Sequence, residues 1–211
     1  MADQHEPAAA GGRPSGDRDA TDVVAVSVAA YTPVAAAYRR THDDRMADRV
    51  ERFAGLLPVP SLVLDAGCGP GRDMARFAAL GHVARGIDAN PAFVAMAAVH
   101  APTVLGDLRD LADIYPAGFF DGVWACASLV HLPRPEAADV LGQMATVLRP
   151  VGRCYACVPV GPEGFVDEPD GRRWYAGWDA RAFAETVVAA GFVVDDVQEG
   201  PFVEVWATRL P

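Results

Sequence analysis

The stretch Val63-Leu64-Asp65-Ala66-Gly67-Cys68-Gly69-Pro70-Gly71-Arg72-Asp73 decides the fold, because in it three glycines alternate with other residues directly after a short apolar run. Glycine has no Cβ atom and tolerates positive φ, so such a loop can turn sharply and bring its backbone close to a ligand. A helical pattern with Met74, Phe77 and Ala78 on one face begins immediately behind the loop. Strand, glycine-rich turn and helix in this order are typical of α/β proteins, whose ligands bind beyond the carboxyl end of the strand.

Predicted strands and helices alternate along the rest of the chain. We expect strands at 61–65, 82–88, 103–107, 119–125, 151–158, 192–198 and 202–209. Between them we expect helices at 73–80, 91–100, 135–149 and 179–190. The alternation predicts the α/β class, with a doubly wound, mostly parallel sheet and helices on both faces. Glu199-Gly200-Pro201 predicts a tight turn that makes the last strand antiparallel.

Three segments stand apart from this pattern. Residues 1–20 are polar and lack an apolar core, so we expect a disordered leader rather than a signal peptide. Residues 21–60 predict short helices over 22–38 and a longer one over 42–57, which would form part of a roof over the binding domain at 61–211. Residues 159–178 are turn-rich and predict a lid loop.

Composition narrows the classes of function. The net charge is −10, and all 18 cationic side chains are arginine. The absence of lysine excludes Schiff-base chemistry and a P-loop lysine, and the acidic balance with no basic patch disfavours a nucleic-acid partner. No run of about 18 apolar residues predicts a membrane-spanning helix. We therefore expect a cytoplasmic protein with no membrane partner, working as a monomer or homodimer.

Four cysteines are present, and two of them, Cys154 and Cys157, have the C-x-x-C spacing. This spacing occurs in redox pairs and in halves of zinc sites. In a strand, however, positions three apart face opposite sides of the sheet, and no second Cys or His pair follows. The sequence therefore favours buried strand thiols, and it predicts no metal site.

Acidic residues end three of the predicted strands. Asp88 follows Gly67 by 21 positions, and a carboxylate there can accept hydrogen bonds from both hydroxyls of a ribose. Asp107 could accept from the exocyclic amine of an adenine. The alternatives are a helix-capping Asp88 and a turn Asp107. With Asp65 at the first strand end, the three acids favour a nucleoside site at one edge of the sheet.

The glycine spacing separates two classes of nucleoside cofactor. Dinucleotide-binding folds favour G-x-G-x-x-G/A, whose last small residue lets the helix pack on the strand. Counted from Gly67, the sixth position is Arg72, which is large and charged. A nicotinamide-dependent oxidoreductase is therefore the weaker alternative.

From about Tyr31 to Arg209 the sequence resembles the Rossmann-like class I S-adenosylmethionine-dependent methyltransferases of the small-molecule type. The matching motifs are the stretch 63–71, Gly86-Ile87-Asp88-Ala89-Asn90-Pro91, Gly106-Asp107-Leu108, Phe120-Asp121-Gly122-Val123-Trp124-Ala125 with Leu129-Val130-His131-Leu132, and Leu148-Arg149-Pro150-Val151-Gly152. Val151 stands where this family usually has glycine. The resemblance implies a seven-stranded sheet in the order 3-2-1-4-5-7-6, with the seventh strand antiparallel.

The resemblance also implies the cofactor S-adenosylmethionine, with S-adenosylhomocysteine as product. The glycine backbone would contact the methionine part, and Asp65 would orient this loop and reach the amino group through water. Asp88 would hold the ribose, Asp107 and Leu108 would contact the adenine, and Ala125 would line the path of the sulfonium. Arg72 is a candidate partner of the cofactor carboxylate, or alternatively a surface arginine. The residues implied as cofactor contacts are Asp65, Gly67, Cys68, Gly69, Gly71, Arg72, Asp88, Ala89, Asp107, Leu108, Ala125, and Tyr31 or Tyr38.

Methyl transfer is an in-line displacement to an O, N or C nucleophile, so alignment supplies much of the catalysis. His131 is the candidate general base, because its pKa suits that role near neutral pH; packing or substrate binding is the alternative. The lid would contact the acceptor through Phe165, Arg172, Arg173, Trp174, Tyr175 and Trp178, although Trp174 and Trp178 would equally pack the loop on the sheet. No large inserted domain is present, which favours a small-molecule acceptor. A cofactor-binding module without catalysis remains an alternative, and the arginine-only composition is associated with bacterial secondary metabolism.

Overall fold

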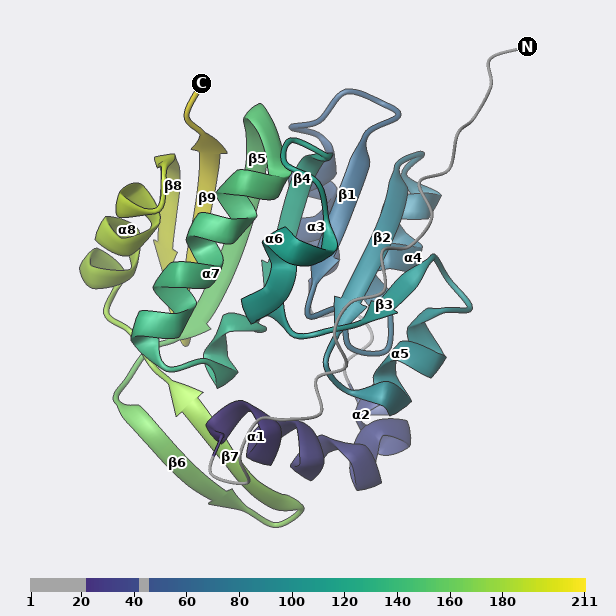
Figure 1. Cartoon of the computed structure of the whole chain (residues 1–211), viewed down its shortest axis with the longest axis vertical. Coiled ribbons are helices and arrows are strands. Elements are labelled where there is room, and N and C mark those ends of the chain that lie inside the picture. Colours follow the sequence, from purple (N-terminus) through teal and green to yellow (C-terminus); the bar gives the residue numbers. More distant parts are fainter. Residues whose placement is uncertain (1–21, 42–45) are drawn as a thin grey trace.

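The structure, a computed structural model, describes residues 22–41 and 46–211. The predicted leader at 1–20 and residues 42–45 of the predicted helix at 42–57 lie outside this range. A seven-stranded sheet with the order β3-β2-β1-β4-β5-β9-β8 forms the centre of the molecule (Figure 1). Its strands are β1 Leu62–Ala66, β2 Val83–Asp88, β3 Thr103–Leu105, β4 Phe120–Cys126, β5 Leu148–Pro159, β8 Phe192–Glu199 and β9 Phe202–Arg209. None of the helices in the described ranges is long and apolar enough to cross a membrane.

The pairing of these strands confirms the predicted topology. The pairs β3–β2, β2–β1, β1–β4 and β4–β5 are parallel, whereas β9 is antiparallel to both of its neighbours. Because β6 and β7 form a separate hairpin, β8 and β9 are the sixth and seventh strands of this sheet. The order is therefore the 3-2-1-4-5-7-6 that the family resemblance implies. Central strands are buried on both faces, which is why β1 and β4 are mainly apolar runs, interrupted by Asp65 and Asp121, rather than alternating patterns.

Two hydrophobic layers flank the sheet. The first packs against α6 Leu111–Ile114, α7 Arg134–Val147 and α8 Ala180–Ala189, which lie in front of the sheet in Figure 1. The second packs against α3 Ala47–Ala54, α4 Arg72–Ala79 and α5 Pro91–Ala97. Cys154 belongs to the first layer and Cys157 to the second, so the two thiols face opposite sides of β5 as predicted.

The N-terminal helices lie at the edge of the sheet where the parallel strands end. The helix α1 Val23–Tyr31 continues through a 3-10 turn at Thr32–Val34 into α2 Ala35–Thr41. The Asn90 side chain, at the start of α5, donates to the Val28 carbonyl at 3.0 Å and to the Thr32 hydroxyl at 3.2 Å. These contacts attach the helices directly above the end of β2.

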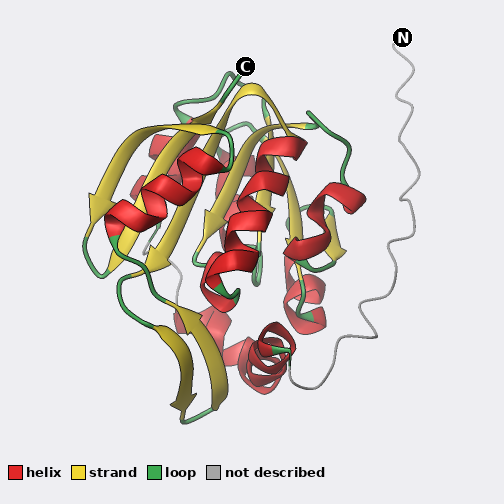
Figure 2. Cartoon of the chain, turned by 60° about the vertical axis from the view of Figure 1, so that its left-hand side comes forward, coloured by secondary structure: helices red, strands yellow, loops and turns green. Residues whose placement is uncertain are grey.

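Residues 159–178 are not the loop that the sequence predicted. They contain a β-hairpin, formed by β6 Glu163–Glu168 and β7 Gly171–Ala176, which lies beside α1 (Figures 1 and 2). The sequence carries the signal for its turn: Pro169-Asp170-Gly171 is a standard turn tripeptide, and Gly171 has a φ of +141°. The backbone N–H of Trp174 donates to the Ser27 hydroxyl at 2.9 Å, which joins the hairpin to α1.

Candidate functional site

The glycine turn after β1 needs glycine for steric reasons as well as for its backbone angles. Gly67, Gly69 and Gly71 all have positive φ, of +78°, +53° and +85°. A Cβ atom at Gly67 would lie 2.3 Å from the Cβ of Ser128, which follows β4, whereas a Cβ at Gly69 would meet nothing within 4 Å. Gly71 instead abuts Ala97 of α5. The turn is therefore in close contact with Ser128, after β4, at Gly67, whereas its backbone is open at Gly69.

Asp88 ends β2 and faces this turn. Its two carboxylate oxygens accept hydrogen bonds of 2.8 Å from the backbone N–H groups of Gly69 and Asn90. Burial raises the pKa of Asp88 to about 6, and the two N–H donors work in the opposite direction. A carboxylate has about four acceptor positions. Asp88 therefore retains capacity for the two hydroxyl donors of a ribose.

Asp65, in β1, is buried next to the turn. Its Oδ2 atom has no hydrogen-bond partner among the residues that the structure describes. Burial raises the pKa of Asp65 well above its ordinary value, and the nearby carboxylate of Asp73 adds to this. An unpartnered buried acceptor costs about 1–3 kcal/mol. A ligand that brings a cationic donor to this oxygen would remove that cost.

Arg72 and Asp107 already have protein partners. The Arg72 guanidinium donates to Asp73 at 2.6 and 2.9 Å. Asp107 caps the 3-10 turn Leu108–Asp110 and accepts on both oxygens from Arg109, which also bonds Asp22 and Glu136. Arg109 thus occupies the acceptor positions that the sequence analysis assigned to an adenine amine. Leu108, the neighbouring residue, remains at the cavity.

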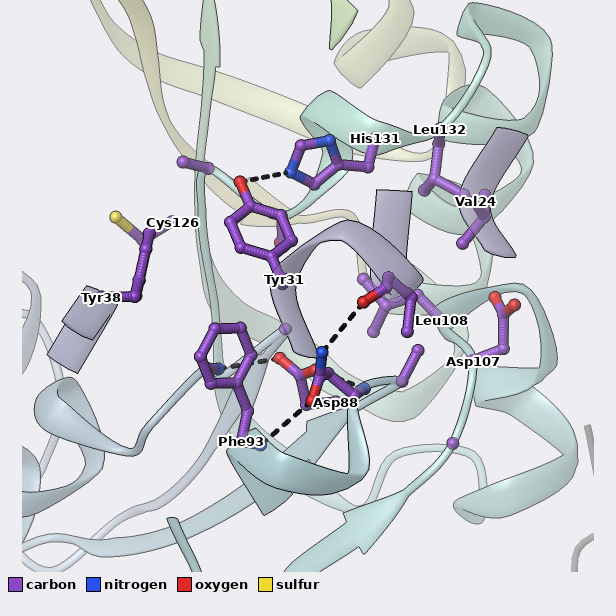
Figure 3. A pocket seen from close by; sticks show the side chains of 18 residues that line it. Val24, Tyr31, Tyr38, Asp88, Phe93, Asp107, Leu108, Cys126, His131 and Leu132 are labelled. Atoms are coloured by element: carbon purple, nitrogen blue, oxygen red, sulfur yellow. Dashed lines mark hydrogen bonds between the residues drawn. The ribbon is translucent and has the colours of Figure 1, made fainter. Parts of the chain in front are cut away.

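One cavity gathers most of the predicted cofactor contacts together with His131 (Figure 3). Its lining residues are Val24, Val28, Tyr31, Tyr38, Gly67, Gly69, Asp88, Ala89, Asn90, Phe93, Gly106, Asp107, Leu108, Cys126, Ala127, Ser128, His131 and Leu132. A second hollow shares Tyr38, Gly67, Gly69 and Cys126 with it and adds Asp65, Cys68 and Arg72 among others. The two hollows meet at the glycine turn, so a ligand lying on the turn would reach both Asp65 and Asp88.

Several predicted residues do not line either hollow. Ala125 is fully buried in β4, and Gly71 packs on α5. None of the six residues predicted for the lid is among the lining residues. Trp178 packs against Phe183 in the core, and Phe165 packs against Trp174.

The hairpin instead supports two residues that do line the cavity. The Arg173 guanidinium is buried and lies 4.1 Å from the centre of the Tyr31 ring. The Trp174 carbonyl oxygen lies 2.7 Å from Nδ1 of His131, and the Tyr175 ring packs against the His131 ring. In the described part of the chain, no hydrogen bond or ring contact joins Tyr31 or His131 to Phe165, Arg172 or Trp178. The hairpin thus acts behind Tyr31 and His131.

His131 lies in the 3-10 turn Leu129–His131 that follows β4. Its Nε2 atom is 3.0 Å from the hydroxyl of Tyr31, and Figure 3 shows that hydroxyl pointing at the imidazole. Burial lowers the pKa of His131 to about 4. The imidazole is therefore neutral at physiological pH and is bonded at both nitrogens.

Comparison with known proteins supports the family resemblance. Residues 63–152, which span the glycine turn, all three acids and His131, match the family model of a methyltransferase domain. The match covers less than half of the chain, and it agrees with the resemblance to the class I S-adenosylmethionine-dependent methyltransferases that the sequence motifs carry. The cofactor of this family fits the residues present, because Asp65 offers an unpartnered oxygen and Gly69 leaves its backbone open on the side where a Cβ would stand.

Two curated methyltransferases match part of this chain. A trans-aconitate 2-methyltransferase of Methylobacterium radiotolerans is 34% identical over 120 residues, which cover 56% of this chain and 45% of that protein. A 27-O-demethylrifamycin SV methyltransferase of Amycolatopsis mediterranei is 36% identical over 113 residues, which cover 49% of this chain and 41% of that protein. The chain therefore matches less than half the length of these relatives.

A solved structure shares the methyltransferase fold over most of the chain. It is a 1,6-didemethyltoxoflavin-N1-methyltransferase of Burkholderia thailandensis with bound 1,6-didemethyltoxoflavin and S-adenosylhomocysteine. Its TM-score is 0.70 at 24% identity, and the match covers 89% of this chain and 88% of that chain. This likeness shows the fold.

Several residues of the candidate site are not predicted from the sequence. Ser128 lines the cavity with a buried hydroxyl that has no partner within the described ranges. Phe93 packs against Tyr31 and Tyr38, and Cys126 lies 3.9 Å, sulfur to sulfur, from Cys157 on the neighbouring strand. Cys126 is the last residue of the central strand β4 and Ser128 lies two positions after it, so their place at a strand end is a sequence signal for the site. No sequence signal of this kind marks Phe93 or Arg109.

Proposed function

We propose that this protein transfers a methyl group from S-adenosylmethionine to a small molecule. The observation that carries the proposal is the unpartnered buried oxygen of Asp65 beside a glycine turn that Asp88 flanks on its other side. An amino group at Asp65 and a ribose at Asp88 are both parts of this cofactor. A nicotinamide dinucleotide offers no ammonium group to Asp65, and Arg72 fills the position where its fold needs a small residue.

In the proposed complex each residue has a defined task. Asp65 accepts from the amino group, Gly67 and Gly69 supply the backbone surface, and Asp88 accepts from the ribose. Ala89 and Leu108 pack on the adenine, whereas Asp107 holds Arg109. The bound cofactor supplies an activated methyl group, and the protein's contribution is to align the acceptor with it and to exclude water.

The proposed acceptor is a small molecule that lies beneath α1. The two curated relatives and the solved structure are named for small-molecule acceptors, which supports this size class. Residues of α1 and α2 line the cavity, and the hairpin at 163–176 lies behind them against α1. We infer that the segment 159–178 acts as a lid by positioning Tyr31 and His131.

Calorimetric titration of the purified protein tests the proposal. We expect S-adenosylmethionine and S-adenosylhomocysteine to bind and NADH not to bind. Tighter binding of NADH would reject the proposal in favour of an oxidoreductase. Binding of both adenosyl compounds, without formation of S-adenosylhomocysteine when mixed candidate acceptors are supplied, would indicate a non-catalytic module.

A further inference from the structure

The proton positions in the Tyr31–His131 pair follow from its neighbours. The Trp174 carbonyl can only accept, so Nδ1 of His131, 2.7 Å away, carries the proton. The neutral imidazole then has only an acceptor at Nε2, and the Tyr31 hydroxyl, 3.0 Å from it, is the donor. Nε2 of His131 therefore already accepts a hydrogen bond from Tyr31. The atom of the pair that can accept a hydrogen bond from a ligand is the Tyr31 oxygen.

Both members of the pair are neutral at physiological pH. Burial lowers the pKa of His131 to about 4 and raises the pKa of Tyr31 above its ordinary value. The groups that face the pair from other elements are Tyr38 on α2 and Arg173 and Tyr175 on β7. Arg173 is itself paired with Glu168 and with Asp170, the latter at 2.8 Å, and the Tyr175 hydroxyl donates to Glu168 at 2.7 Å.

The cavity around the pair is apolar and lacks a cation. Val24, Val28, Phe93 and Leu132 line it on the side of α1 and α5, and no arginine is among its described lining residues. Its only charged groups, Asp88 and Asp107, are acidic. A carboxylate or phosphate elsewhere on the acceptor, away from the reacting oxygen at Tyr31, would find no partner here, and burying such a charge unpaired is costly.

Resting on the proposed function, we propose that the acceptor is a neutral, planar hydroxyl compound of the phenol class, and that Tyr31 is the catalytic residue that takes its proton. As the acceptor oxygen gains the methyl group, its O–H bond breaks and this proton passes to the Tyr31 oxygen. The proton of Tyr31 passes at the same time to Nε2 of His131, which becomes an imidazolium ion. His131 acts through Tyr31 and is a positioning residue. After the ether has left, the imidazolium returns a proton to the Tyr31 oxygen, and the other proton of that oxygen passes to water that enters the cavity.

A weakly basic histidine is sufficient for this step. An ether oxygen that still carries a proton is a far stronger acid than an imidazolium ion, so the transfer is downhill even with the lowered pKa of His131. The fixed Nδ1–H···O bond to Trp174 keeps Nε2 directed at Tyr31 in both protonation states. This accounts for a hairpin that touches the pair but does not line the cavity.

Nitrogen NMR of the unaltered protein tests the pair without turnover. We expect a single neutral His131 tautomer, protonated at Nδ1, that does not titrate between pH 8 and about pH 5 because its pKa is near 4. In Tyr31→Phe we expect the same tautomer with the Nε2 resonance shifted to that of an unbonded acceptor. A tautomer protonated at Nε2, or titration near pH 6.5, would overturn the inference whether or not the variant folds.

Turnover with matched naphthols tests the chemistry. The unaltered protein should methylate naphthol and an acidic nitronaphthol but not naphthol that carries a carboxylate. Tyr31→Phe should lower kcat for naphthol by about a hundredfold, the lower end for a general base, and leave kcat for the ionised nitronaphthol within about threefold. Tyr115→Phe removes a buried hydroxyl outside the cavity and should leave both rates unchanged.

The outcomes separate this inference from the proposed function. Equal loss of both rates in Tyr31→Phe would make Tyr31 structural and overturn the inference. Binding of S-adenosylhomocysteine by a protein that methylates no naphthol, or that prefers the carboxylate derivative, would also overturn it and leave the proposed function standing. Failure to bind S-adenosylhomocysteine would reject both.

Discussion

The carboxylate of Asp88 accepts a hydrogen bond of 2.8 Å from the backbone N–H of Gly69, so the end of β2 holds the glycine turn that follows β1. The second oxygen of Asp88 accepts from the Asn90 N–H, and Asn90 in turn bonds α1. One buried carboxylate therefore connects the turn, the start of α5 and the roof. A substitution at Asp88 tests the cofactor site and its scaffold together.

We expect Asp88→Asn to weaken S-adenosylhomocysteine binding by about 1–3 kcal/mol, which is roughly 5- to 150-fold. An amide offers one acceptor oxygen in place of two, so the N–H groups and the ribose hydroxyls compete for it. Calorimetry measures the change. Asp195→Asn, on the exposed part of β8, is the control and should bind as tightly as the unaltered protein. Unchanged affinity in Asp88→Asn would remove Asp88 from the ribose site.

The affinity for S-adenosylhomocysteine should depend on pH. The pKa of Asp88 is about 6 without ligand, and ribose hydroxyls favour the charged carboxylate, so binding lowers that pKa. Affinity should therefore be constant above pH 7 and should fall as the pH drops through 6, by up to about tenfold per unit. Asp65, whose pKa is also raised, acts in the same direction. Asp88→Asn should flatten the profile in part. A flat profile for the unaltered protein between pH 7.5 and 5.5 would contradict the assignment.

The sequence predicted the arrangement of the acids because parallel strands end at the same edge of a sheet. Asp65 and Asp88 needed only a correct strand assignment to be brought together. It did not predict that Arg109, two positions further along, would fill the acceptor positions of Asp107, because the same arginine is held by Asp22, 87 positions before it, and by Glu136. Long-range pairings of this kind leave no local pattern.

The same limit explains the role of His131. Its position after β4 predicted that it would reach the cavity, and it does. Its partners, however, come from 100 positions earlier, at Tyr31, and 43 positions later, at Trp174. The Trp174 contact depends on a hairpin whose turn, Pro169-Asp170-Gly171, lies in the segment that the sequence predicts as an irregular loop. The sequence therefore predicts a general base without its partners, whereas the structure shows His131 bonded to Tyr31 and to Trp174.

Two glycine substitutions should differ in their effect on stability. Both Gly67→Ala and Gly69→Ala place a side chain at positive φ, which costs about 1–2 kcal/mol. Only Gly67→Ala also drives a Cβ to 2.3 Å from Ser128, so we expect it to lower the free energy of unfolding by about 3 kcal/mol or more. Denaturant unfolding measures both. The double variant Gly67→Ala, Ser128→Gly should recover the difference, and equal losses in the two single variants would show that the contact with Ser128 is unimportant.

Arg109→Met should loosen the roof. Arg109 joins Asp22, which caps α1, to Asp107 at the end of the sheet, and both carboxylates are mostly buried. Removing one partner of a buried pair costs about 3–5 kcal/mol, and we expect about 2 kcal/mol here because Arg109 retains some exposure to solvent. The loss should concentrate in α1, because Asp22 is then released while the sheet keeps its core. Hydrogen exchange should therefore accelerate at the α1 amides more than in β4. Arg181→Met, which removes an exposed arginine of α8, should change neither stability nor exchange by more than about 0.5 kcal/mol. Uniform acceleration in α1 and β4 would mean that Arg109 stabilises the whole domain rather than its roof.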